Sequence, residues 1–233
     1  MRLFDDYIKK VSFILKPWIS VAYSETGEDW MNRLQNQNTY IMEKDKALEL
    51  GGYPKESINL IAGTSQELPI HGIHRISGKI DNKKQISFGK VVLLRSEGVS
   101  DSDVYEFCQN VLIADVRFWL KDVMLRSSSQ RYLLNFRVGR KAVESGFNDE
   151  IMARTIHKYF SQIPNVKEVA VILIYGDHPV YKDLLPIAED VKHVSSALNT
   201  IFNGLEMNCG SCNLNEICKE VEGLRELHHQ MKS

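Results

Sequence analysis

Three cysteines near the C-terminal end of the sequence have the spacing of a metal or iron-sulfur ligand set. Cys209, Cys212 and Cys218 form a C-x2-C-x5-C pattern in the run MNCGSCNLNEIC. Thiolates are soft ligands that select zinc or iron-sulfur clusters, and a two-residue gap lets both flanking sulfurs turn onto one centre. Gly210 and Ser211 fill that gap and suit a tight turn. We therefore expect a metal site here, rather than a buried Cys218 beside two incidental thiols.

The sequence offers several candidates for the fourth ligand of such a site. His228 stands ten positions after Cys218, with His229 beside it, and histidine can replace cysteine as a cluster ligand. Ten residues of helix, however, rise about 15 Å, which is too far for both ends to hold one cluster. Glu222 lies four residues after Cys218 and would share its helix face. Cys108, brought in from another helix, or a partner protein are the remaining options.

The composition is that of an ordinary globular protein, with 43% hydrophobic and 25% charged residues. Lys and Arg (29) almost balance Asp and Glu (30), so no overall field would attract nucleic acid or anionic lipid. No apolar run approaches the ~18 to 20 residues of a membrane span, and Asp5 and Asp6 stand where a signal peptide carries positive charge. We expect a cytoplasmic protein without nucleic-acid or membrane partners. In that reducing compartment, clustered cysteines favour metal binding over disulfides.

Hydrophobic periodicity predicts an α+β fold, with a mixed β-sheet flanked by helices. Residues 1–55 would form an N-terminal helical segment, residues 56–205 the α+β domain, and residues 206–233 the cysteine knuckle with a short terminal helix. The expected helices cover 3–16, 28–50, 104–124, 148–162, 179–205 and 214–231, and the expected strands cover 57–62, 73–80, 85–95, 132–138 and 166–175. The pair Gly51-Gly52 would stop the second helix. Residues 132–175 would form a strand, helix, strand unit.

The stretch from Gln130 onward resembles the middle part of acetyl-CoA synthase, the β subunit of carbon monoxide dehydrogenase/acetyl-CoA synthase. In QRYLLNFRVGRKAVESG, the pair Gln130-Arg131 leads into a strand with Arg137, as in that family. A helix follows, and the strand in KEVAVILIYGD ends in an I-Y-x-D pattern at 174–177. A helical segment then leads to the cysteines. The order and the gaps carry the resemblance, which covers about the last 110 residues, residues 70–130 weakly and residues 1–60 not at all.

The resemblance implies that Cys209, Cys212 and Cys218 bind a 4Fe-4S cluster. The family has a fourth cysteine about ten residues after the third, where His228 stands here, and later cysteines that hold two nickel-site metals; this sequence has none of these. We therefore expect an accessory protein of one-carbon metabolism that acts with a corrinoid iron-sulfur protein or carbon monoxide dehydrogenase. Nickel is not expected in this chain alone. If the protein is an enzyme, it would be a component of a CO-methylating acetyl-CoA synthase, which is an acyltransferase.

The resemblance also implies coenzyme A as a second ligand, bound in the family through arginines and an aromatic residue. Guanidinium groups suit phosphate and stack on adenine. The candidates are Arg126, Arg131, Arg137 and Arg140, and Arg131 and Arg137 share a face if one strand spans both. The family's tryptophan has no counterpart at the equivalent place, and surface arginines without a ligand are the competing interpretation.

Two other interpretations are open. In the first, the three cysteines and one of Glu222, His228 or His229 hold a structural zinc in an interaction protein without catalytic activity. In the second, the chain is an α+β binding protein with reduced thiols and no metal. The same spacing also resembles the cluster knuckles of radical enzymes, in which a cysteine usually stands where Glu222 is. His71 and His74 have metal-like spacing but no third ligand nearby in the sequence, which favours a structural role.

Overall fold

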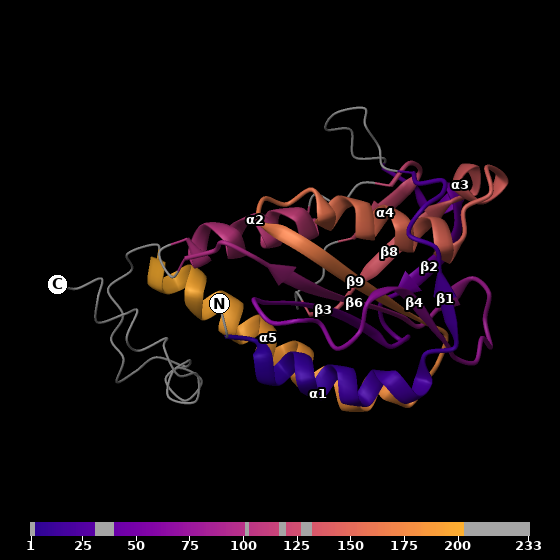
Figure 1. Cartoon of the computed structure of the whole chain (residues 1–233). Helices are drawn as coiled ribbons and strands as arrows, with labels where there is room; N and C mark the ends of the chain where they lie inside the picture. Colours follow the sequence, from indigo (N-terminus) through magenta and orange to yellow (C-terminus); the bar gives the residue numbers. More distant parts are fainter. Residues whose placement is uncertain (1–2, 31–39, 101–102, 117–119, 127–131, 203–233) are drawn as a thin grey trace.

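Two β-sheets with helices packed against them make up the protein in the computed structural model (Figure 1). The structure describes residues 3–30, 40–100, 103–116, 120–126 and 132–202. Its helices are α1 Asp5–Leu15, α2 Val104–Val116, α3 Arg140–Glu144, α4 Asp149–Ser161 and α5 Val180–Phe202, with 3-10 turns η1 Lys16–Trp18 and η2 Glu43–Asp45. Its strands are β1 Val21–Tyr23, β2 Lys46–Gly51, β3 Ser57–Thr64, β4 Gly72–Ser77, β5 Gln85–Ile86, β6 Phe88–Ser96, β7 Val123–Leu125, β8 Asn135–Gly139 and β9 Val166–Tyr175.

The larger sheet has the strand order β1-β4-β9-β6-β3, and the smaller sheet has the order β5-β2-β8-β7. Both are mixed. β3 pairs parallel with β6 and β4 parallel with β9, whereas β6 and β9 run antiparallel. The central strand β9 is apolar from Val169 to Ile174, as expected of a strand buried on both faces. The α+β class predicted from the sequence is confirmed.

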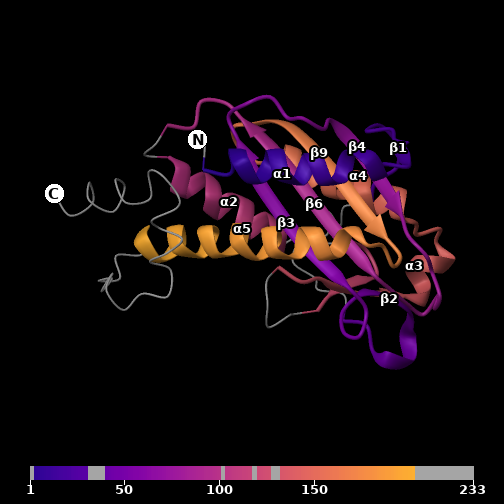
Figure 2. The same ribbon diagram turned by 90° about the horizontal axis from the view of Figure 1, so that it is seen from below.

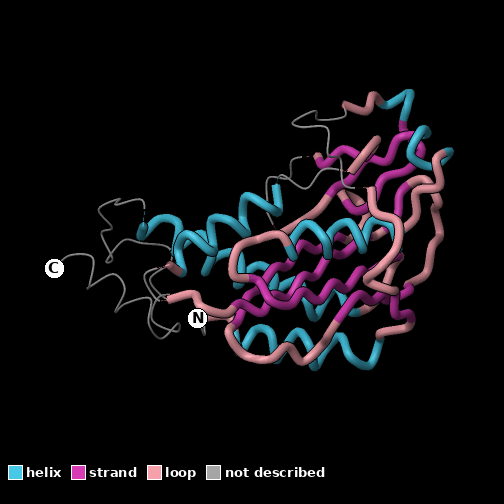
Figure 3. The backbone as a smooth tube through the Cα atoms, turned by 45° about the horizontal axis from the view of Figure 1, so that its top comes forward, coloured by secondary structure: helices cyan, strands magenta, loops and turns pink. Residues whose placement is uncertain are grey.

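The two faces of the larger sheet belong to different cores. Helices α1 and α5 cover one face, whereas α2, α4 and the smaller sheet lie on the other (Figures 1 and 2). Strand β6 shows how alternation serves both cores, because Val91 and Leu93 point to the first core and Phe88, Val92 and Leu94 to the second. Figure 3 shows the helices on either side of the strands. In the described parts of the chain, no helix is both long enough and apolar enough to cross a lipid bilayer.

Several local predictions hold closely. The helix expected over 3–16 is α1, whose buried residues Ile8, Val11, Ser12 and Leu15 follow helical spacing. The helix expected over 148–162 is α4, where the Asn148 side chain accepts a hydrogen bond from the Ile151 N–H at 2.9 Å. The strand expected over 166–175 is β9.

The helix expected over 28–50 is wrong where the structure describes it, because residues 46–51 form strand β2. β2 pairs with β8, so long-range hydrogen bonds override the local helical spacing. The glycine pair ends a strand and not a helix. Gly51 and Gly52 have φ values of +74° and +76°, and a Cβ on Gly51 would lie 2.3 Å from the Leu134 carbonyl oxygen. Only glycine fits this close approach. Residues 1–55 are therefore not a purely helical segment.

Two further element boundaries and one predicted strand pairing differ from the structure. The helix expected over 104–124 ends at Val116, and Val123–Leu125 is strand β7. The strand expected over 85–95 is interrupted at Ser87, which separates β5 in the smaller sheet from β6 in the larger one. The strand, helix, strand unit is also split, because β8 and β9 belong to different sheets. Residues on either side of a loop carry no local signal for which sheet they will join.

Candidate functional site

The cysteine knuckle predicted for residues 206–233 lies outside the described residues. This holds for Cys209, Cys212, Cys218, Glu222, His228 and His229, and also for Arg131 and for the helix expected over 214–231. Of the other predicted site residues, the structure places Cys108, Arg126, Arg137 and Arg140. Arg126 and Arg137 both contact Glu49, whereas Cys108 and Arg140 lie elsewhere.

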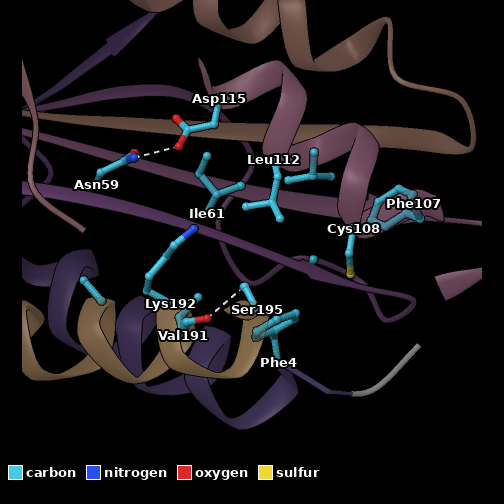
Figure 4. Close-up of a pocket in the computed structure, with 13 residues that line it drawn as sticks. Phe4, Asn59, Ile61, Phe107, Cys108, Leu112, Asp115, Val191, Lys192 and Ser195 are labelled. Carbon is cyan, nitrogen blue, oxygen red and sulfur yellow. Dashed lines mark hydrogen bonds between the residues drawn. The ribbon is translucent and has the colours of Figure 1, made fainter. Parts of the chain in front are cut away.

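Cys108 lies on α2 and lines a pocket between α2, α5 and the edge strand β3 (Figure 4). The cysteine is not in a disulfide, and burial raises the pKa of its thiol to about 11. At neutral pH the thiol is therefore protonated and a poor nucleophile or ligand, unless a metal displaces the proton. Ser195 of α5 lines the same pocket and stands 14 positions before Cys209 in the sequence.

The pocket has a volume of about 50 Å³ and combines apolar walls with a polar end. Its lining comprises Phe4, Asn59, Ile61, Gly63, Phe107, Cys108, Val111, Leu112, Asp115, Ala188, Val191, Lys192 and Ser195. Asn59, Ile61 and Gly63 alternate along β3, so one side of the strand forms its floor. Helices α2 and α5 form the two walls.

A buried ion pair builds the polar end of this pocket. The Lys90 Nζ lies 2.6 Å from the Asp115 Oδ1, and the Asn59 Nδ2 donates to the Asp115 Oδ2 at 2.8 Å. Lys90 is 1% exposed, and its ammonium group also lies 5.9 Å from the centre of the Phe160 ring. A lysine this deep is tolerated because its charge is paired. Asn59 and Lys90 are brought together by the β3–β6 register, in which they are partners.

Sequence reasoning did not identify Asn59, Lys90 and Asp115 as a cluster. One signal for it is present, because Lys90 interrupts the otherwise apolar run FGKVVLL of a buried strand. Such a charge needs a partner. Nothing in the sequence, however, indicates that the partner comes from α2.

Arg137 lies on β8 and is held by carboxylates. Its Nη2 lies 3.0 Å from the Glu49 Oε1 and 2.8 Å from the Glu43 Oε2, and its Nη1 donates to the Ile41 carbonyl at 3.1 Å. Glu49 also pairs with Arg126, at 3.2 Å. Strand β8 begins at Asn135 and does not include position 131. The condition under which Arg131 and Arg137 would share a face of one strand is therefore not met.

The remaining cation of this group is Lys46, whose Nζ lies 3.6 Å from the Glu49 Oε1. The hydrogen bond from Lys46 is the main reason that the pKa of the exposed Glu43 lies below its ordinary value. The cluster of Lys46, Arg126, Arg137, Glu43 and Glu49 thus has three cations for two carboxylates. Arg140 is not part of it and is exposed at the start of α3.

The residues of the I-Y-x-D pattern, 174–177, lie at the C-terminal end of β9 in the larger sheet. The Asp177 carboxylate accepts a hydrogen bond from the Ser87 hydroxyl and lies 2.7 Å from the Lys55 Nζ. Lys55, followed by Ser87, keeps the pKa of Asp177 below its ordinary value. The Tyr175 ring packs under the Arg75 guanidinium, 5.0 Å away. These contacts give the motif residues a structural role where β9 ends.

The histidine pair does not converge on a common point. His74 Nε2 donates to the His71 carbonyl at 2.6 Å, whereas His71 Nδ1 contacts the Glu168 carboxylate. Within the described ranges, no three His, Cys, Asp or Glu residues are grouped so that they could hold a metal ion. A structural interpretation of His71 and His74 fits these contacts.

Comparison of the chain with models of known protein families and with curated proteins found no match.

Proposed function

We propose that this protein is acetyl-CoA synthase-like and binds a 4Fe-4S cluster through Cys209, Cys212 and Cys218. It would act beside a corrinoid iron-sulfur protein or carbon monoxide dehydrogenase in cytoplasmic one-carbon metabolism. One observation carries the proposal: the C-x2-C-x5-C pattern follows the Gln-Arg, Arg and I-Y-x-D motifs in the same order and with gaps similar to those of that family. Soft thiolates at this spacing are the ligands that such a cluster needs.

The described fold supports a scaffold role for the segment that carries the resemblance. Residues 135–175 form β8, α3, α4 and the central strand β9, and the Asp177 contacts anchor the end of β9. Helix α5 then runs from Val180 to Phe202 along the sheet and precedes the cysteines in the sequence. A rigid element that leads into a ligand-bearing segment suits a protein that presents a cluster to a partner.

An accessory role fits this chain better than complete acetyl-CoA assembly. The 233 residues contain four cysteines. A cluster would use three of them, and Cys108 lies in the α2–α5 pocket with a raised thiol pKa. That leaves no thiolates for a separate two-metal site, where methyl and carbonyl groups would be joined and transferred to coenzyme A.

Coenzyme A is the second ligand in the proposal, with Arg131 and Arg137 as candidate contacts. The excess positive charge around Glu49 favours a phosphate there, because three cations face two carboxylates. Arg126 is the more accessible partner, with a side chain that is 42% exposed against 12% for Arg137. The contacts of Arg137 with Glu49 and Glu43 favour a structural role for this arginine.

The decisive experiment is the metal content of protein purified without oxygen. We expect about four irons per chain with sulfide and a broad visible absorption, as for a 4Fe-4S cluster. Cys209→Ala and Cys212→Ala should each abolish this iron, because each change removes one thiolate ligand. The circular dichroism spectrum of each variant checks that the sheets and helices remain folded. Glu222→Gln, His228→Asn and Cys108→Ala, compared side by side, would identify the fourth ligand.

Other metal contents would change the conclusion. One zinc without sulfide would favour the structural zinc knuckle in an interaction protein. Absence of any metal, or unchanged iron in both cysteine variants, would refute the cluster site.

A further inference from the structure

Most of the lining of the pocket between α2, α5 and β3 is apolar. Ile61 of β3 lies at its floor, and Leu112 of α2 and Val191 of α5 lie on opposite walls (Figure 4). The Cys108 thiol is protonated at neutral pH, because burial raises its pKa to about 11, and it adds a small apolar group to the wall. A ligand that fits these walls therefore needs a hydrocarbon portion.

The polar end of the pocket offers a hydrogen-bond acceptor. The Asp115 carboxylate lies 2.6 Å from the Lys90 ammonium group and accepts the Asn59 amide N–H at 2.8 Å. An ionised carboxylate has about four acceptor positions and no donor, so it can accept from a further group. The Asp115 side chain is 14% exposed, whereas Lys90 is 1% exposed, so the carboxylate is the accessible member of the pair. We therefore expect a ligand that donates a hydrogen bond.

The charges around this acceptor favour a ligand without charge. Lys90 already compensates Asp115, so a cationic ligand would lose its hydration without meeting an uncompensated carboxylate. An anionic ligand would lie against the same carboxylate and be repelled. Lys192, the other charged lining residue, already has an interaction partner within the protein, so its charge is not free to attract an anion. A neutral donor such as a hydroxyl group avoids these costs.

The size of the pocket limits the length of the ligand. Its volume is about 50 Å³, and one water molecule needs about 10–15 Å³ of a cavity. The pocket therefore holds about three to five groups of that size. One hydroxyl group at the polar end leaves room for two to four carbons between the apolar walls.

We propose that this pocket binds a small neutral alcohol of two to four carbons. The hydroxyl group donates to the Asp115 carboxylate, and the hydrocarbon end lies between Leu112 and Val191. The site does not depend on the proposed cluster or on coenzyme A, because Cys108 contributes only apolar surface to it.

The first test compares two isomers on the full chain by ligand-observed NMR. The probe is 1-butanol, and the reference is methyl propyl ether, which has the same atoms but no hydroxyl donor. The alcohol should bind saturably and about tenfold or more tightly than the ether, because it alone donates to a charged acceptor. Butyrate and butylammonium, which add a negative or a positive charge, should both bind more weakly than 1-butanol.

Ser195→Leu tests the location of the site. The Ser195 hydroxyl donates to the Val191 carbonyl one turn earlier at 2.8 Å, so its loss should be tolerated while the larger side chain fills the pocket and abolishes butanol binding. Ser161→Leu is the matched control. Ser161 makes the same bond, to the His157 carbonyl at 2.8 Å, but it lies on α4 outside the pocket and should leave binding unchanged. Thermal unfolding of both variants checks that they fold.

Four results would each overturn the proposal. They are the absence of saturable butanol binding, ether binding as tight as that of the alcohol, butyrate or butylammonium binding as tight as that of the alcohol, and unchanged butanol affinity in folded Ser195→Leu. The comparison of the isomers uses the wild-type chain, so it decides the proposal even if Ser195→Leu does not fold.

Discussion

Glu49 and Arg137 face each other across β2 and β8, and each is almost buried as a side chain, at 11% and 12% exposure. Opposite charges in such cross-strand positions stabilise a sheet, but removal of one partner leaves a poorly solvated charge. Lys90 and Asp115 repeat this arrangement between the larger sheet and α2. These ion pairs link β2 to β8 and the larger sheet to α2.

Arg137→Ala should lower the free energy of unfolding by about 2 kcal/mol, because Glu49 loses the most buried of its cationic partners among the described residues and keeps the more exposed Arg126 and Lys46. Arg140→Ala is the matched control, because Arg140 is exposed and should cost less than ~0.5 kcal/mol. Urea unfolding followed by circular dichroism measures both. Equal stability of the two variants would show that the Arg137 contacts are not structural, and would strengthen its assignment to coenzyme A.

Among the helices and strands, the sequence predicted those that are defined by a single capping residue or by one hydrophobic period. Helix α4 begins at a capping asparagine with Asp149 and Glu150 in its first turn, and α1 has a clear apolar stripe. Strand β2 shows the opposite case. Its sequence is compatible with a helix, and only the pairing of Leu48 with Val138 and of Leu50 with Phe136 makes it a strand.

Asn148→Ala should destabilise the protein by about 1 kcal/mol, because the Ile151 N–H loses its acceptor at the start of α4. Asn148→Asp should retain most of the stability, since aspartate caps equally well. Thermal unfolding of the two variants gives the comparison. If alanine and aspartate were equivalent at this position, the hydrogen bond would not contribute to stability.

For the whole molecule, the free energy of unfolding should depend on pH, because two histidines are partly buried in the folded protein. Burial lowers the pKa of His157 on α4 and of His178 before α5, both from an ordinary value of 6.5. Between that value and the lowered one, the unfolded chain binds more protons than the folded protein. The folded protein is therefore most stable, with respect to these two histidines, above pH 6.5. Its free energy of unfolding decreases as the pH falls below that value.

We expect the midpoint of urea unfolding to decrease from about pH 7 to about pH 5, within the window that lowered histidine pKa values define. The double variant His157→Gln/His178→Gln should show a shallower decrease, because neither glutamine titrates. Midpoints measured at several pH values, at constant ionic strength, provide the slopes. An identical slope in the wild type and the double variant would rule out these histidines as its source.

The α+β class, the positions of α1, α4 and β9, and the metal-ligand spacing of Cys209, Cys212 and Cys218 could all be read from the amino-acid order alone. Each of these rests on signals within a few turns of chain, namely hydrophobic period, capping and side-chain type. Two other features became visible only in the folded protein: β8 and β9 belong to different sheets, and Asn59, Lys90 and Asp115 form the polar end of a pocket. Those outcomes depend on hydrogen bonds and ion pairs between residues distant in sequence, and no local pattern encodes which distant partner will be reached.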